Sequence, residues 1–168
     1  MPTRHNYRLN LAAYHPQQQP SPGLDLRAPT GADAANLAVL MLDAYRDTID
    51  YDGETLEQAR QEVESFLNGV YGPPLLNCSR LGFLDGNLAA ACLVSRWGEH
   101  PLICFVMTGA RWKNQGLAQA VLHQTLQCLA AAGHPLVDAV ITEGNHPSER
   151  LFARIGFSRY DLYGRPGV

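Results

Sequence analysis

Two stretches of the sequence combine residue types that could do chemistry. The first is the loop of residues 109–118, which joins an apolar run to a long amphipathic segment. Amides at a helix N-terminus lack intrahelical partners and lie at the positive end of the helix dipole. A phosphate could therefore bind there, because Gly116 and Ala118 leave the approach open and Lys113 adds a positive charge. The alternative is a plain strand–loop–helix connection whose glycine only relieves backbone strain.

The second stretch is acidic. Residues 46–54 contain four carboxylates, Asp47, Asp50, Asp52 and Glu54. Their summed negative field could receive a cationic amine. The alternative is a solvated acidic loop that favours the N-terminus of the following helix. A calcium loop is a third option and a poor one because, counted from Asp50, glycine occupies position four instead of six, and Gln61 occupies position twelve, where a bidentate glutamate is required.

Hydrophobic periodicity predicts the elements that must position these residues. Capping boxes at Thr30 and Thr55 mark two helix starts, and Asp85-Gly86 marks a hairpin. The predicted strands are residues 7–11, 24–27, 77–84, 88–96, 102–108, 137–142 and 157–163, and the predicted helices are residues 30–45, 55–69, 117–133 and 145–156. This order is typical of a single α/β (α+β) domain with a mixed sheet.

Composition limits the class of protein. The chain has 168 residues and 18.4 kDa, and its 46% hydrophobic and 17% charged residues are ordinary for one globular domain. A net charge of −3 leaves no basic footprint for nucleic acid. Because no run of 18 apolar residues and no signal-peptide stretch occurs, we expect a soluble cytoplasmic protein without a membrane partner. The four widely spaced cysteines are interpreted as free thiols.

Two motifs carry a resemblance to a known family. Residues 113–118, Lys-Asn-Gln-Gly-Leu-Ala, resemble the R/Q-x-x-G-x-G/A pyrophosphate loop of the GNAT superfamily of acetyl-CoA-dependent N-acetyltransferases. Residues 145–157 resemble that family's N-x-x-A/S-x-x-L-Y/F-x-x-x-G-F segment. Both occur in the family's order, with a helix, a glycine and a strand between them, and the resemblance covers about residues 24–163. It implies a mostly antiparallel twisted sheet with a V-shaped splay between the fourth and fifth family strands, flanked by about four helices.

The resemblance also implies acetyl-CoA as a co-substrate and requires no metal. The strand end at Val106, Met107 and Thr108 would pair with the pantetheine arm and polarise the thioester. The pyrophosphate would be held by Lys113, Asn114, Gln115, Gly116, Leu117 and Ala118. Asn145 and Phe152 would line the thioester end of the cleft.

Two departures from the family pattern affect the expected chemistry. Lys113 stands where arginine or glutamine is usual and lacks the arginine fork. Phe152 stands where many members have a tyrosine that protonates the leaving thiolate, so Tyr160, another nearby hydroxyl or water must fill that role. Glu143, at the end of a strand, could take the proton of the attacking ammonium. Alternatively, its carboxylate only interacts favourably with the dipole at the N-terminus of the following helix.

The sequence therefore predicts transfer of an acetyl group from acetyl-CoA to an amine by direct attack in a ternary complex. The acceptor would be a small molecule or a protein, drawn in by Asp50, Asp52 and Glu54. The alternative is a non-catalytic sensor that binds CoA or acyl-CoA, or an interaction module.

The N-terminal segment is predicted to be an extension in front of a domain of residues 24–168. Residues 1–23 read as a short strand followed by a linker rich in proline and glutamine. GNAT folds carry a further C-terminal strand, but only residues 164–168 follow Tyr163 here. Residues 7–11 are therefore expected to supply a compensating strand, either in cis or from the second subunit of a homodimer.

Overall fold

The computed structural model describes residues 2–16 and 21–161, in which seven strands form one sheet. The strands are β1 (Arg4–Asn10), β2 (Leu24–Arg27), β3 (Arg80–Leu84), β4 (Asn87–Trp97), β5 (His100–Thr108), β6 (Leu136–Thr142) and β7 (Ser158–Tyr160). Their spatial order is β2-β3-β4-β5-β6-β1-β7. Every neighbouring pair is antiparallel except β5 and β6, which are parallel, so the predicted mixed and mostly antiparallel sheet is confirmed.

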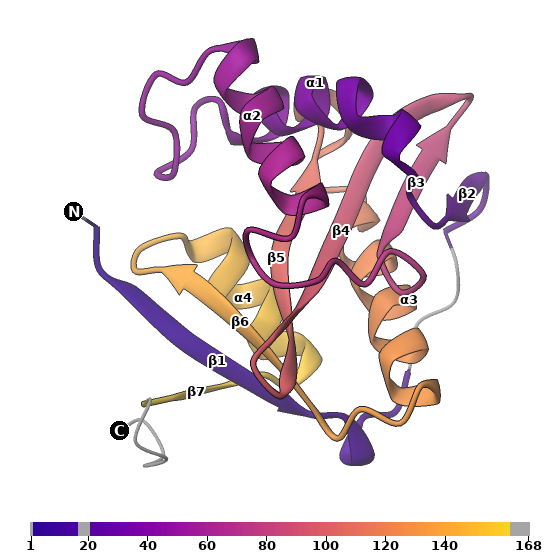
Figure 1. Cartoon of the computed structure of the whole chain (residues 1–168), viewed down its shortest axis with the longest axis vertical. Coiled ribbons are helices and arrows are strands. Elements are labelled where there is room, and N and C mark those ends of the chain that lie inside the picture. Colours follow the sequence, from indigo (N-terminus) through magenta and orange to yellow (C-terminus); the bar gives the residue numbers. More distant parts are fainter. Residues whose placement is uncertain (1, 17–20, 162–168) are drawn as a thin grey trace.

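Four α-helices cover the two faces of this sheet (Figure 1). They are α1 (Ala34–Tyr45), α2 (Leu56–Leu67), α3 (Leu117–Ala131) and α4 (His146–Ile155). The two predicted capping boxes are present: Thr55 caps α2, whereas Thr30 caps a short 3-10 turn, Gly31–Asp33, that leads into α1. The predicted hairpin turn is also present, because Asp85 and Gly86 both have the positive φ angles, 49° and 78°, of a type I′ turn.

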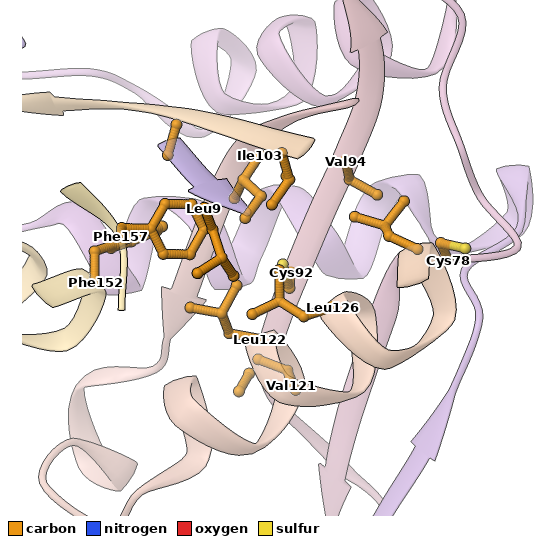
Figure 2. Close-up of a cluster of buried hydrophobic side chains, with 14 of the residues drawn as sticks. Leu9, Cys78, Cys92, Val94, Ile103, Val121, Leu122, Leu126, Phe152 and Phe157 are labelled. Atoms are coloured by element: carbon orange, nitrogen blue, oxygen red, sulfur yellow. The ribbon is translucent and has the colours of Figure 1, made fainter. Parts of the chain in front are cut away.

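The core has two layers, one on each face of the sheet. Between the sheet and the pair α1–α2 lie side chains such as Met41, Val63 and Phe66, together with Leu93 and Met107 from the strands. On the opposite face, α3 and α4 pack over a second cluster that Figure 2 shows around Cys92, Ile103 and Leu122, with Phe152 and Phe157 at one end.

Strand β1 is part of the sheet interior. It pairs with β6 over its whole length, from Arg4 opposite Thr142 to Asn10 opposite Leu136, and with β7 on its other edge. Its Leu9 is 6% exposed and lies in the core beside Phe152 and Phe157 (Figure 2). The chain thus supplies the expected compensating strand in cis. The final strand β7 is shorter than predicted, and residues 162 and 163 of that prediction lie outside the described residues.

The expectation of four free cysteines was wrong for two of them. Cys78 and Cys128 form a disulfide across a separation of 50 residues, with their Cα atoms 5.3 Å apart. That spacing is ordinary for a disulfide, but two cysteines so far apart give no local pattern by which the sequence reveals it. The bridge ties the segment before β3 to the last turn of α3, while Cys92 and Cys104 remain free.

Reduction of this disulfide is expected to destabilise the protein. Opening a 50-residue loop returns about 4 kcal/mol of chain entropy to the unfolded state on the loop-entropy model. Thermal melts with and without a phosphine reductant should therefore separate clearly. A Cys78→Ser/Cys128→Ser variant should melt like the reduced protein and ignore the reductant; a variant that still responds would place the sensitivity elsewhere.

Candidate functional site

The parallel strands β5 and β6 diverge to form the site (Figure 1). They pair only at Leu102 with Asp138 and at Ile103 with Ala139. Beyond these pairs, β5 continues to Thr108 and β6 to Thr142 without pairing to each other. The facing edge of β5 therefore presents backbone N–H and C=O groups that a strand-like ligand could pair with. This is the expected V-shaped splay.

A β-bulge marks the inner end of the splay. Phe105 is opposite Leu93 of β4 and Ile103 is opposite Val94, so Cys104 has no counterpart across the pair. A bulge bends its strand and re-aims the groups beside it. Here it lies one residue beyond the last β5–β6 pair, where the two strands begin to separate.

A cavity of about 720 Å³ occupies the splay. Its lining comes from β5, β6 and the start of α4, from α1, α2 and the segments that follow these two helices, and from Arg4 at the start of β1. Val106, Asn145 and Phe152 from the predicted cofactor set line it, as do Asp50 and Glu54 from the predicted acceptor set. The volume is in the range typical of small-molecule sites.

The predicted pyrophosphate loop ends at an uncapped helix N-terminus. Gly116 adopts φ +78° at the N-cap of α3, and no side chain caps the helix. The first turn's hydrogen bond runs from the Ala120 amide to the Gly116 carbonyl, so the amides of residues 117–119 precede it. A Cβ atom placed on Gly116 would meet nothing within 4 Å, so the approach to these amides is open. The arrangement fits an anion.

The lysine of the loop has a structural contact. Lys113 Nζ donates a hydrogen bond of 3.0 Å to the carbonyl of Ala44 in the last turn of α1. Nearby, the amide of Ala110 donates to Asp43 Oδ2 at 2.8 Å. These two contacts join the loop to α1, while the neighbouring Asn114 takes a left-handed backbone conformation, φ 64°. The lysine ammonium therefore anchors the loop as well as adding positive charge to it.

The acidic stretch is connected to the end of β6 through one carboxylate. Asp50 Oδ1 accepts a 2.6 Å hydrogen bond from the Thr142 hydroxyl, and its Oδ2 accepts one of 2.8 Å from Asn145 Nδ2. The Oδ1 atom of Asn145 in turn caps α4 by accepting from the Ser148 amide. Asp50 thus joins the segment after α1 to the end of β6 and the N-cap of α4, and all three line the cavity.

The other two predicted acceptor carboxylates differ in their positions. Glu54 lines the cavity, and its Oε2 accepts a 2.8 Å hydrogen bond from the Asp52 amide. Asp52 itself is exposed and is absent from the cavity lining, so the structure brings together only Asp50 and Glu54.

The two predicted catalytic side chains lie away from the cavity lining. Glu143 has a side chain 62% exposed, 3.4 Å from His5 Nε2. Tyr160 lies on β7, where the Arg8 guanidinium is 4.3 Å from its ring centre. Burial and the nearby Asp138 carboxylate raise the pKa of Tyr160. Neither residue lines the cavity.

Phe152 contacts both the cavity and the core. It is 4% exposed and packs edge-to-face on Phe157, with ring centres 4.9 Å apart (Figure 2). The remaining predicted cofactor residues, Met107 and Thr108, close β5, and the Met107 side chain is buried under α1 and α2. Met107 can therefore serve a ligand only through its backbone, in the way that the family resemblance implies, whereas Thr108 is partly exposed.

A carboxylate–phenol pair in the cavity was missed in the sequence. The Tyr71 hydroxyl donates to the Glu62 carboxylate of α2, and both residues line the cavity. Burial and this hydrogen bond raise the pKa of Tyr71 to about 12. The Tyr71 ring lies edge-on to Phe105, with ring centres 6.1 Å apart.

A glycine beside Tyr71 could have drawn attention to this segment. Gly72 has φ +88°, and a Cβ atom there would lie 1.9 Å from the Arg96 carbonyl oxygen. Only glycine permits this close approach of the chain to β4. The approach places the neighbouring Tyr71 at the cavity. The signal is the run of glycines and prolines in residues 69–74, which the sequence marks as a turn without showing what it faces.

The sequence of the C-terminal half decides the family. The family model described as FR47-like protein matches residues 80–165, more than half of the chain. The chain belongs to this FR47-like family of the GNAT superfamily. The matched range runs from β3 through the splay and both predicted motifs to the last strand. No curated protein matches the chain in sequence.

Solved GNAT structures share the fold of this FR47-like chain. A GCN5-related N-acetyltransferase from Sphaerobacter thermophilus has a TM-score of 0.72 at 18% identity, over 95% of this chain and 50% of that one. The ribosomal-protein-S18-alanine N-acetyltransferase of Escherichia coli has a TM-score of 0.65 at 13% identity, over 85% and 88%. A tandem GNAT protein from the clavulanic acid biosynthesis pathway has a TM-score of 0.67 at 18% identity, over 95% and 51%. The FR47-like chain thus spans about half the length of the first of these structures.

Two further findings concern the described part of this FR47-like chain. None of its helices in residues 2–16 and 21–161 is long and apolar enough to cross a membrane. Within the same residues, no three His, Cys, Asp or Glu side chains are grouped so that they could hold a metal ion.

Proposed function

We propose that this GNAT chain is an N-acetyltransferase that moves the acetyl group of acetyl-CoA to an amine. The observation that carries the proposal is the splay itself. A cavity large enough for a thioester and an acceptor lies between β5 and β6, and the loop of residues 109–116 joins β5 to the uncapped N-terminus of α3. β5 and the loop after it thus join a site for an extended arm to a site for an anion. This arrangement matches acetyl-CoA, in which the extended pantetheine arm is attached to a pyrophosphate.

The chain's own groups suit each part of that co-substrate. The backbone edge of β5 at residues 106–108 would pair with the amides of the pantetheine arm as an added strand does. The amides of residues 117–119, with the helix dipole behind them, would hold the pyrophosphate. Asn145, which caps α4 and contacts Asp50, would order the wall beside the thioester.

The reaction needs one proton acceptor for the amine. The amine nitrogen attacks the acetyl carbonyl carbon, the carbon–sulfur bond breaks, and the departing thiolate takes a proton. We propose Glu62 as the group that removes the ammonium proton, because its carboxylate lines the cavity while Glu143 lies outside the lining. Tyr71 holds that carboxylate in place. Tyr160 lies outside the lining too, so we assign protonation of the thiolate to water.

A second candidate is a sensor that binds acyl-CoA without turnover. It is favoured by Phe152, a buried ring with no proton to give at the position where many family members have a tyrosine. Such a protein would bind acetyl-CoA through the same amides and backbone edge, so binding alone cannot separate the two functions.

Two measurements test the proposal. Acetyl-CoA should raise the melting temperature, because a ligand at 100 times its Kd stabilises the native state by about 2.7 kcal/mol. Free thiol should then be released from acetyl-CoA when amines are added, at a rate that depends on the amine. A thermal shift without amine-dependent thiol release would favour the sensor. No shift at millimolar acetyl-CoA would contradict both functions.

A further inference from the structure

The charged groups that line the cavity differ in whether they have partners. Its three carboxylates are all hydrogen-bonded: Asp50 by Thr142 and Asn145, Glu54 by a backbone amide, and Glu62 by Tyr71. Arg4 supplies the cavity's cationic side chain, and within the described residues it makes no hydrogen bond or ion pair. A guanidinium has five N–H donors and a planar fork that fits a carboxylate. The unpaired recognition group of this cavity is therefore a cation.

Arg4 is held at the cavity by the sheet. It opens β1 and lies opposite Thr142 at the end of β6. Residues directly opposite each other in an antiparallel pair point to the same face. Thr142 contacts Asp50 on the face that α1 and α2 cover, so Arg4 is on that face too. The carbonyl of the preceding Thr3 accepts a 2.8 Å hydrogen bond from the Glu143 amide, which fixes this end of β1.

The cationic group and the carboxylate–phenol pair face the same space. The Arg4 charge acts on Tyr71, where it lowers the pKa against the larger raising effect of burial. The guanidinium and the Glu62–Tyr71 pair thus line one cavity. The Glu62–Tyr71 pair lies over Phe105, next to the bulge where the splay begins, whereas Arg4 is exposed at the open end of β6.

We infer that the acceptor is a small amino carboxylate, bound with its carboxylate on Arg4 and its amine toward Glu62. This inference rests on the proposed acetyltransferase function and names its substrate class. The amine end meets a carboxylate, which suits an ammonium, and the acid end meets an unpaired guanidinium. A diamine or polyamine would place its second positive charge against Arg4, so the same site disfavours it.

The experiment compares acceptors that differ in one group. Amino acids and their carboxamides are assayed as pairs for thiol release from acetyl-CoA, beside a series of diamines. The wild-type protein should prefer the acid over the amide by about tenfold in kcat/KM, the size expected for one charge-assisted contact of about 1.4 kcal/mol. Arg4→Gln should remove that preference through KM for the acid and leave the amide unchanged. Arg4→Lys should keep part of it.

The control variant removes a charge outside the cavity. Arg159→Gln, on the exposed part of β7, should keep the wild-type preference. Equal or better use of the carboxamide or a diamine by the wild-type protein would overturn the inference, and so would an equal loss for acid and amide in Arg4→Gln. If a diamine is acetylated and no amino acid is, the acetyltransferase function stands and the substrate class falls. If no amine releases thiol, both fall.

Discussion

A chain that lacks residues 1–13 is expected to lose its cooperative thermal transition. Strand β1 pairs with β6 along its whole length and is the one neighbour of β7 in the described sheet. Its removal would uncover the edges of both strands and the core sites of Leu9 and Leu11, which are 6% and 3% exposed. The loss of two buried leucines alone costs about 4–10 kcal/mol, comparable with the whole stability of a domain. Circular dichroism melting and elution volume would measure the effect.

Two further samples make this result specific. Deletion of residues 1 and 2 alone removes nothing from β1 and should leave the melting curve unchanged. A synthetic peptide of residues 2–13, added to the truncated chain, should restore the transition if the vacated position in the sheet still accepts its own strand. A truncated chain that melts and elutes like the full chain would show that β1 contributes nothing to the stability of the sheet.

The order of elements could be predicted because each one has local signals. The caps at Thr30 and Thr55 and the Asp85-Gly86 turn depend on residues within three positions of one another, and all three are present in the structure. The position of β1 between β6 and β7 depends on pairing across more than 120 residues. The Cys78–Cys128 disulfide similarly depends on how the chain folds back on α3. Local patterns carry no information on such distant pairs. The expectation that residues 7–11 complete the sheet therefore came from the family resemblance and not from the spacing of residues.

The residues of the candidate site also divide into those that the sequence indicated and those whose position depends on the fold. Asp50 was singled out as part of the acidic stretch and Asn145 through the family motif, and the structure joins them through a hydrogen bond of 2.8 Å. Glu143 follows β6 directly, and side chains of successive strand residues alternate between faces. Thr142 turns toward Asp50, so Glu143 is directed elsewhere, toward His5. Glu62 lies half-buried at the border of the apolar face of α2, and in the sequence it is indistinguishable from a solvated glutamate until the fold places a cavity beside it.

Gly116→Glu is expected to abolish the thermal shift that acetyl-CoA produces. A side chain at this position would extend into the open space in front of the uncapped α3 amides, where the pyrophosphate is proposed to lie. Its carboxylate would take up the favourable interaction with the helix dipole and repel a second anion. We expect affinity for acetyl-CoA to fall by roughly 100-fold, equivalent to about 2.8 kcal/mol. Differential scanning fluorimetry over a range of acetyl-CoA concentrations would measure this loss.

The matched control is a glycine at the opposite end of the same helix, α3. Gly133, just beyond the C-terminus of α3, also has a left-handed backbone, φ +88°, and a Cβ atom there would likewise meet nothing within 4 Å. Gly133→Glu therefore introduces the same charge and the same strain of about 1–2 kcal/mol, away from the proposed anion site. It should lower the melting temperature more than Gly116→Glu does, because a carboxylate at the C-terminus of α3 interacts unfavourably with the helix dipole, and it should keep the full response to acetyl-CoA. Equal loss of the response in both variants would trace it to general damage to the helix, and normal binding by a folded Gly116→Glu protein would move the anion site away from the α3 amides.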